Sequence, residues 1–420
     1  MNTAFTFNTH CNSFLPKKKE FIITYARCFE TSIRDSAKLF GPAWIALLAD
    51  ADAASILGGL STGEEYGYKL IWFVMLLSLP LFIIQEASGR LGAISGKGIG
   101  ELIREYYSRK VSILSIFPIF FVDFFTYLSE YAGIAIGCYL IGIIPLFGLV
   151  IFFILHVIIV LTKNYEITER YLVVVSVILL LSALIIVGPK LNFTGQEVLY
   201  FSTSKNFLFF IAVNIGAVVT PPCMLIYQSS ATAIKYPKID INNSKKISWI
   251  TIETLLGAII TELIIVLSEM IGTSIGNIDP TDPAQLLYNL GNFHYIFGIT
   301  LISAGFLTLI VVSLSSAWGL LEALGKNNYK NSVKIYIMES IPAMLIVSLM
   351  LGNYSSVINF ALTLLSLSPI VIAIPAVMVG ILISNKKIMG KYTYTRTRLV
   401  AYFFTIVMIV VGGFVGTLHL

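Results

Sequence analysis

Two aspartates stand two positions apart in one of the most apolar stretches of the chain, ALLADADAASILGG at residues 46–59. An ionised aspartate at the centre of a bilayer costs about 2.5–3.5 kcal/mol on insertion scales, so Asp50 and Asp52 need partners, a water-filled cavity or a function. In an intact helix, positions i and i+2 point about 200° apart, so both acids face one site only where the backbone unwinds. Gly58 and Gly59 are expected to lower the resistance to unwinding. The stretch predicts an interrupted helix that presents carboxylates to a cation.

A second interruption is expected in NIGAVVTPPCMLIYQSS, residues 214–230, where Pro221 and Pro222 are adjacent. Proline has no N–H group, so these two residues leave the carbonyl groups of Ala217 and Val218 without helical partners. An unpaired carbonyl in lipid costs several kcal/mol unless something satisfies it, and a cation would do so. A kink rescued by water or by a neighbouring hydroxyl is the alternative.

Together the two interruptions offer four oxygen donors. They are the Asp52 carboxylate, the hydroxyls of Ser55 and Thr220, and the freed carbonyl of Ala217. Oxygen donors suit hard cations such as Mg²⁺, Mn²⁺ or Ca²⁺ over soft ones. The sequence therefore predicts a divalent cation as substrate, and it gives no indication of a resident cofactor.

The composition places these residues in a membrane. Of the 420 residues, 57% are hydrophobic and only 12% are charged, which is outside the range of soluble globular proteins. Windows of roughly 20 apolar residues, the length that crosses a bilayer core, predict about eleven helices. The predicted spans are 41–62, 69–92, 112–142, 145–162, 169–188, 206–233, 247–273, 294–322, 334–352, 354–384 and 398–417.

The basic residues predict the orientation. With eleven spans, all of the 28 Lys and Arg fall on one side except Lys69, Lys190 and Lys205. Cytoplasmic loops carry the excess of Lys and Arg, so the N-terminus is expected in the cytoplasm and the C-terminus outside, in a multi-pass protein of the cell membrane. The net charge of +5 is then a topology signal and not a nucleic-acid footprint.

The positions of the interruptions predict the architecture. They fall in the first and the sixth span, and broken helices at corresponding positions of two five-helix halves are typical of inverted repeats, with the binding site between the halves. We expect a cytoplasmic tail at 1–40, one repeat at 41–188, a second at 206–384 and an additional helix at 398–417.

Several stretches resemble the Nramp divalent-metal transporters. GPAWIALLADADAASILGGLSTGEEYGYKLIW and QEASGRLGAISGKGIGELI are similar to the first two helices of that family, whose first helix carries an Asp-Pro-Gly-Asn motif. NIGAVVTPPCMLIYQSS is similar to its sixth helix, where Met-Pro-His is usual, and LSEYAG and SSAWGLLEALG add support. The resemblance runs from about residue 40 through the tenth span and implies an all-α, LeuT-like 5+5 fold.

The resemblance also implies a ligand set. It places Asp52 and Ser55 on the Asp and Asn of the first motif, and Thr220 and Ala217 on the Met and the carbonyl-donating alanine of the sixth helix. Thr220 stands in place of this Met. In the family, the thioether of the Met favours Mn²⁺ and Fe²⁺ over Mg²⁺ and Ca²⁺. The small residues at positions 51, 53, 54, 55 and 220 would leave room for a hydrated Mg²⁺.

Other departures concern protons. Gly59 stands where the family has an Asp of its proton route, and no histidine occurs in the first or sixth span. The pattern resembles the Nramp-related magnesium transporter branch, in which the Met is replaced and proton coupling is lost. Glu130 matches a family acid. The residues expected beside the ion or its path are Asp50, Glu130, Gly59, Pro221 and Tyr227.

Further polar residues in the spans receive simpler interpretations. Glu130 is expected to line the water path below the site, whereas Asp123 and Glu322 are expected to be solvated near span ends. Glu262 and Glu269 share a helix face and are expected to make packing contacts, and His156 is expected to be a hydrogen-bonded core residue.

The sequence thus predicts a transporter of divalent cations, Mg²⁺ or Mn²⁺, that works by alternating access without obligatory proton coupling. A proton-coupled Mn²⁺/Fe²⁺ importer, with Asp50 or Glu130 transferring protons, remains open, as does an amino-acid or amine transporter of the same superfamily. No nucleotide loop or catalytic triad occurs, so an enzyme is not expected. Beyond the metal ion and the lipid bilayer, no protein partner and no nucleic acid is indicated.

Overall fold

The computed structural model describes residues 38–162, 164–187, 199–218, 222–276, 281–326, 329–353 and 368–417, with a few isolated positions between them. Every regular element in these ranges is a helix. The first half contains α2 (Pro42–Leu48), α3 (Ala53–Tyr66), α4 (Ile71–Ser95), α5 (Ile99–Tyr106), α6 (Arg109–Leu140), α7 (Pro145–Val160) and α8 (Tyr165–Val187). The second contains α9 (Lys205–Val218), α10 (Pro222–Lys235), α11 (Asn243–Ile275), α12 (Pro283–Leu290), α13 (His294–Leu324), α14 (Tyr329–Leu349), α16 (Ala373–Ile383), α17 (Lys386–Met389) and α18 (Arg396–Thr417).

Each predicted span contains a helix. Where the prediction differs is in the short helices α5, α12 and α17, which lie in segments expected to be loops. Seven helical stretches of the described chain are long and apolar enough to cross a membrane, and the bent pair Ser368–Ile383 and Lys386–Tyr392 would add an eighth. Broken or short spans such as α7 and α9 do not reach that length alone, so the number of eleven stays a prediction.

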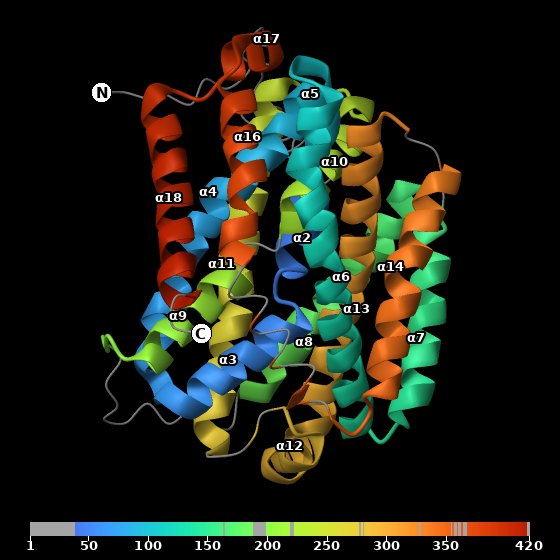
Figure 1. Cartoon of the computed structure of the whole chain (residues 1–420), viewed down its shortest axis with the longest axis vertical. Helices are drawn as coiled ribbons and strands as arrows, with labels where there is room; N and C mark the ends of the chain where they lie inside the picture. Colours follow the sequence, from blue (N-terminus) through green and yellow to red (C-terminus); the bar gives the residue numbers. More distant parts are fainter. Residues whose placement is uncertain are drawn as a thin grey trace, which may run out of the picture.

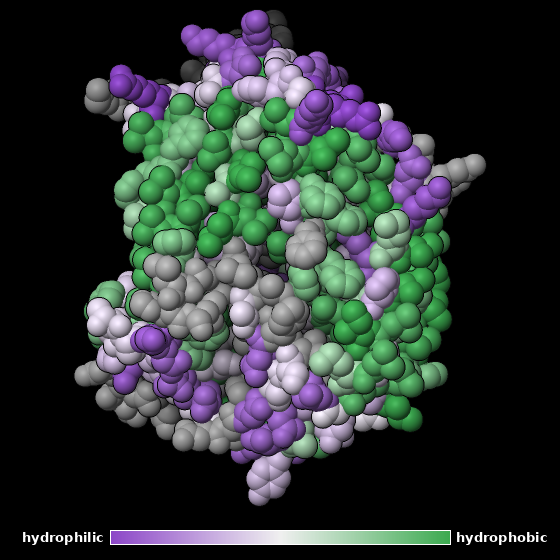
Figure 2. Space-filling model, in the orientation of Figure 1, coloured by the Kyte–Doolittle hydropathy of each residue, from purple (hydrophilic) through white to green (hydrophobic). Residues whose placement is uncertain are grey.

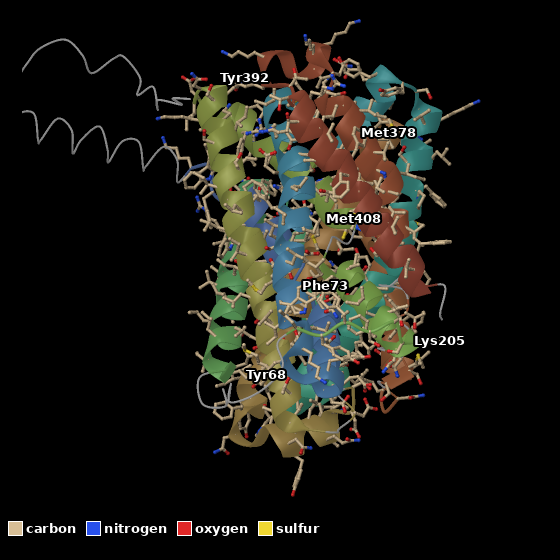
Figure 3. All side chains as sticks on the ribbon, turned by 90° about the vertical axis from the view of Figure 1, so that its left-hand side faces the viewer. Tyr68, Phe73, Lys205, Met378, Tyr392 and Met408 are labelled. Carbon is tan, nitrogen blue, oxygen red and sulfur yellow. The ribbon has the colours of Figure 1, made fainter. Side chains whose placement is uncertain are left out.

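The two ends of the helical bundle correspond to the two sides predicted from the basic residues. Figure 1 shows α5 and α17 at one end and α12 at the other, and Figure 2 shows hydrophilic residues at both ends with an apolar band between them. In Figure 3, Tyr68 and Lys205 lie toward one end, Tyr392 lies at the opposite end, and Met378 and Met408 lie between. We call the end with α5 and α17 the basic end, because the predicted cytoplasmic loops meet there.

The two interrupted spans are paired crosswise. α2 packs against α10, whereas α3 packs against α9. Near the basic end, the Lys235 ammonium at the end of α10 donates a hydrogen bond to the carbonyl of Phe40, just before α2, and forms an ion pair with Glu169 at 2.8 Å. α2 and α10 therefore run in opposite directions, as two halves related by a two-fold axis in the membrane plane would.

Glycines bring α3 and α11 into backbone contact. A Cβ atom at Gly63 would lie 1.8 Å from the Glu269 carbonyl oxygen, and one at Gly272 would lie 2.0 Å from the Leu60 carbonyl oxygen. Lipid tails are as apolar as helix surfaces, so membrane helices associate through close packing. Small residues allow this close approach. α11 also packs along α4 and α2, so it forms a continuous support behind the first interrupted span.

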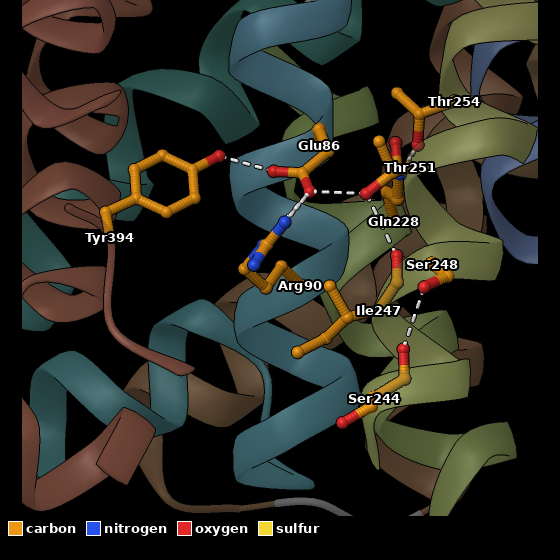
Figure 4. A network of polar contacts seen from close by, with 9 residues as sticks. All are labelled: Glu86, Arg90, Gln228, Ser244, Ile247, Ser248, Thr251, Thr254 and Tyr394. Carbon is orange, nitrogen blue, oxygen red and sulfur yellow. Dashed lines mark hydrogen bonds and ion pairs between the residues drawn. The ribbon is translucent and has the colours of Figure 1, made fainter. Parts of the chain in front are cut away.

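A polar network fixes the start of α18 to the rest of the bundle (Figure 4). The Glu86 carboxylate on α4 accepts hydrogen bonds from Arg90 at 3.0 Å and from Thr251 of α11 at 2.8 Å. The hydroxyl of Tyr394, just before α18, donates to the other oxygen of the same carboxylate. Glu86 thus has three hydrogen-bond partners. It lies near the basic end between α4, α11 and the segment before α18, and these partners satisfy its carboxylate.

The contact between α3 and α11 predicts the effect of a small substitution. Gly272→Ala should lower the apparent melting temperature in detergent, because the new methyl group meets backbone that cannot rotate away, at a cost of about 1–3 kcal/mol. The matched control is Gly412→Ala on α18, whose Cβ would meet only the flexible Ile215 Cδ1 at 2.5 Å. Equal melting temperatures for the two variants would contradict the close contact.

Candidate metal-ion site

The first span is interrupted where the two aspartates stand. Residues 49–52 separate α2 from α3, and both Asp50 and Asp52 are completely buried. The predicted unwinding is confirmed, but its expected cause is wrong. Gly58 and Gly59 lie inside α3, where a Cβ at Gly59 would come within 2.9 Å of the Ile265 carbonyl oxygen of α11. These glycines serve helix packing and not the interruption.

Asp52 caps the N-terminus of α3. Its backbone is extended, with φ −74° and ψ 174°, and its Oδ1 accepts a hydrogen bond from the Ser55 N–H at 2.6 Å. The Ser55 hydroxyl and the Ala54 N–H lie close enough to this carboxylate to stabilise its negative charge. Its second oxygen, Oδ2, is buried and has no hydrogen-bond partner in the part of the chain that the structure describes. One side of the Asp52 carboxylate is therefore held in place, and the other is available to a ligand.

Glu130 reaches the same helix N-terminus from α6. Its Oε2 accepts a hydrogen bond from the Ala53 N–H at 3.0 Å, and its Oε1 accepts one from the Ser129 hydroxyl at 3.0 Å. α6 comes this close because Gly133, one turn further along, leaves the space that the Ala53 methyl occupies. Glu130 was expected to line the path below the site, but the structure places it at the interruption itself.

Asp50 contributes a second group of unpaired carboxylate oxygens. Neither of its side-chain oxygens has a hydrogen-bond partner among the described residues, and neither do those of Glu262 on α11. Asp50 lies close enough to Asp52 and to Glu262 for the charges to repel each other. Glu262 is thus more than the packing contact that was expected. None of the ion pairs formed between described residues involves these acids.

Hydroxyl groups satisfy the backbone that the interruption leaves open. The Leu47 carbonyl accepts a hydrogen bond from Thr261 of α11 at 2.5 Å, and the Ala49 carbonyl accepts one from Thr308 of α13 at 2.7 Å. At the other end of α2, the Glu253 carboxylate accepts from the N–H groups of Gly41 and Trp44. The sequence analysis missed these three residues. Each is a polar side chain in an apolar span, and many other positions share that feature, so it does not single them out.

The second interruption lies where it was expected. α9 ends at Val218 and α10 begins at Pro222, so the span 206–233 consists of two helices. Thr220 and Pro221 lie outside the described residues, and nothing is described of the Ala217 side chain, so the contributions of these three residues stay predictions. Cys223, in the first turn of α10, is buried and lies close enough to Asp50 and Asp52 to feel their charge. The start of α10 therefore lies beside the first interruption.

Tyr227 belongs to an aromatic cluster on the basic-end side of the site. Its ring stacks on Trp318 of α13 with a centroid distance of 5.7 Å, and its hydroxyl lies 3.2 Å from that of Tyr165. Trp318 also lines two cavities of about 300 Å³ each. The first is lined by Glu101 and Glu322, and the second by Tyr165. The cluster therefore borders these cavities.

Two expectations about other acids are wrong. Asp123 is completely buried and Glu322 is 6% exposed, although both were expected to be solvated. Each is covered by helices that the sequence could not place beside it. Glu322 accepts a hydrogen bond from Ser230 of α10 at 2.7 Å. His156 is a satisfied core residue as predicted, with its Nε2 2.6 Å from the Ser313 hydroxyl and its Nδ1 3.4 Å from that of Tyr131.

The donor set of the site is built from a few carboxylates and backbone groups. Among the residues that the structure describes, no three Asp, Glu, His or Cys side chains are arranged to hold a metal ion. A partly hydrated ion such as Mg²⁺ needs only one or two carboxylates from the protein. The arrangement can thus hold a hydrated cation against Asp52 while Asp50 and Glu262 supply further negative charge.

Comparison with known proteins agrees with this geometry. The divalent metal cation transporter MntH of Yersinia enterocolitica is 25% identical over 397 residues, which cover 91% of this chain and 95% of that protein. MntH of Bacillus subtilis is 36% identical over 106 residues, a quarter of each chain.

Solved structures share the fold. A manganese transporter of Eremococcus coleocola superposes with a TM-score of 0.74 at 14% identity, covering 97% of this chain and 89% of that one. Mhp1, a nucleobase-cation-symport-1 family transporter, gives a TM-score of 0.51 at 18% identity, with 90% of each chain covered. These likenesses confirm the predicted all-α, LeuT-like fold.

The sequence profile of one family matches residues 43–417, nearly the whole described region. That profile is described as natural resistance-associated macrophage protein-like. The chain is therefore a member of the Nramp family.

Proposed function

We propose that this protein moves divalent metal cations across the cell membrane by alternating access, with the ion bound between the two interrupted spans. The observation that carries the proposal is the group of buried carboxylate oxygens at the first interruption. Asp50, Asp52 and Glu262 have oxygens without hydrogen-bond partners in the part of the chain that the structure describes. Buried charges of one sign need a partner of the other, and a metal ion supplies it.

The helix ends at the interruption support a cation together with fixed acids. The N-terminus of α3 carries partial positive charge, which favours Asp52 and Glu130 as ionised carboxylates. The C-terminus of α2 points its last carbonyl groups at the same place and favours a positive ion.

The MntH proteins to which the chain is similar are named for divalent metal cation transport. Their names support the same substrate class here. Within that class we infer Mg²⁺ or Mn²⁺ as the transported ion, because Thr220 offers a hydroxyl in place of the thioether of the resemblance and the known donors near the site are oxygens. The Cys223 thiol is the exception among the buried groups near Asp50 and Asp52.

The path to the cytoplasm is proposed to run toward the basic end. Glu101 and Glu322 line a cavity there and would attract a departing cation. Tyr165, Tyr227 and Trp318 form the barrier that must separate before the ion can pass. In this proposal the N-terminus is cytoplasmic, and the C-terminus, after the single additional helix α18, lies outside.

We propose transport without obligatory proton coupling, and the groups beside the site support this proposal. Gly59 is packed against α11 and carries no titratable group. The resemblance places Tyr227 where the family has a histidine in its sixth helix, and this side chain contacts Tyr165 and Trp318. A proton-coupled Mn²⁺ or Fe²⁺ importer, with Asp50 or Glu130 transferring the proton, is the competing outcome of the pH experiment below.

The first test removes the charge of the expected ligand. Asp52→Asn should abolish uptake of Mg²⁺ and Mn²⁺ into proteoliposomes, because the substituted amide keeps one oxygen but loses the charge that offsets ion dehydration. Glu105→Gln is the matched control, since that carboxylate is exposed and pairs with Lys97. Unchanged uptake by Asp52→Asn would contradict the site.

A second test concerns protons. Mn²⁺ or Mg²⁺ uptake should proceed at the same rate with and without an imposed pH gradient, and a pH-sensitive dye inside the vesicles should report no acidification during uptake. Acidification that accompanies metal uptake, and that Glu130→Gln removes, would establish the proton-coupled importer instead.

A third test addresses selectivity. Thr220→Met should raise the affinity for Cd²⁺ and Mn²⁺ relative to Mg²⁺ by about tenfold, which corresponds to roughly 1.4 kcal/mol, because it introduces a soft thioether donor. Isothermal titration with the three ions measures the ratio. Thr220→Val serves as control for loss of the hydroxyl alone, and an unchanged ratio in the Met variant would place residue 220 away from the ion.

A further inference from the structure

A second group of buried acids lies away from the interruptions, between α6, α13 and α14. Asp123 of α6 is completely buried, and within the described ranges neither of its carboxylate oxygens has a hydrogen-bond partner. Glu339 of α14 is 2% exposed and lies close enough to Asp123 for the two charges to repel each other. Its Oε1 accepts a hydrogen bond from Ser316 of α13 at 2.7 Å, whereas Oε2 has none. Three carboxylate oxygens are thus buried and unpaired.

Hydroxyl groups surround this pair. The Tyr127 hydroxyl lies beside Glu339 and 2.6 Å from the Ser313 hydroxyl. Ser313 lies in turn 2.6 Å from Nε2 of His156. On the other side, the Cys223 thiol of α10 lies against Asp123. No ion pair formed between described residues reaches either carboxylate.

We infer that Asp123 and Glu339 form a second binding site for a hard divalent cation, with Tyr127 and Ser316 holding Glu339 in position. Two ionised carboxylates buried without a cationic partner cost several kcal/mol each, and one divalent ion neutralises both. Carboxylate and hydroxyl oxygens are the ligands that Mg²⁺ and Mn²⁺ take in proteins, with water completing the coordination shell. The burial and the unpaired oxygens of Asp123 distinguish the site from a solvated acidic cluster.

The helical register of α6 relates this site to the first. Asp123 and Glu130 are seven residues apart, so they lie on the same face of α6 and about 10 Å apart along its axis. α6 begins near the basic end with Arg109, so Asp123 lies on the basic-end side of Glu130. Cys223 lies between the two groups, near enough to Asp50, Asp52 and Asp123 to feel their charges. The second site is therefore a stop for a cation on its way between the interruptions and the basic end, a role that depends on the proposed function.

The binding itself can be tested separately from transport. The full-length chain in detergent is stripped with EDTA and titrated with Mg²⁺ and, in a parallel series, Mn²⁺ by isothermal calorimetry. The wild type should show two binding events, Asp52→Asn and Glu339→Gln should each retain one, and the double variant should retain none. Glu105→Gln, at an exposed carboxylate, is the control and should keep both.

The outcomes separate the two proposals. A single wild-type event that Asp52→Asn removes would overturn the second site and leave the proposed function intact. Binding that survives Asp52→Asn but disappears in Glu339→Gln would support the second site and overturn the first. Binding that Glu339→Gln leaves unchanged in the Asp52→Asn background would also overturn the second site.

Thermal unfolding gives an independent measurement and a check on folding. In the Asp52→Asn background, Mg²⁺ should raise the melting temperature, and adding either Glu339→Gln or Asp123→Asn should remove that rise. Both amide variants should melt no lower than their parent in EDTA, because each removes a buried unpaired charge. An Mg²⁺-induced rise that persists in both amide variants, or a rise produced equally by Na⁺ in place of Mg²⁺, would overturn the assignment to a divalent cation.

Discussion

The structure depends on how the N-terminus of one short helix is held inside an apolar bundle. α3 begins in the interior, where its first N–H groups would otherwise be unsatisfied. The carboxylates of Asp52 and Glu130 accept from those groups, one from the chain just before the helix and one from α6. This requirement fixes both carboxylates at the interruption, and Asp50 and Glu262 lie beside them.

The support for this helix is steric. α3 is pressed against α11 through Gly63 and Gly272, and α6 reaches it through Gly133. A side chain at any of these positions would move the helix away from the groups that cap it. Thr261 and Thr308, from α11 and α13, satisfy the open carbonyls of α2 at the same place. The helices that pack against the interruption are thus also the helices that make its backbone polar groups tolerable in the membrane.

The buried acids extend beyond the interruption without acquiring basic partners. Glu262 on α11 lies close to Asp50, and Asp123 and Glu339 form a further pair of acids on the far side of Cys223. By contrast, Glu86 near the basic end is paired with Arg90 and bonded to Tyr394, and Glu169 is paired with Lys235. The unpaired acids therefore lie deep in the bundle, and the paired ones lie where predicted cytoplasmic loops bring lysine and arginine close.

The sequence alone determined that the chain spans a membrane, where most of its helices lie, and that the first and sixth spans are broken. These features depend on local hydropathy, on buried acids in an apolar run and on missing N–H groups, all of which are written in order along the chain. Only the tertiary structure decided that Glu130 bonds to Ala53, that Glu262 faces Asp50, that Asp123 and Glu322 are buried, and that Gly59 packs against α11. Each of these facts joins residues of different helices, and hydropathy is nearly uniform around a membrane helix, so it does not say which face meets which neighbour.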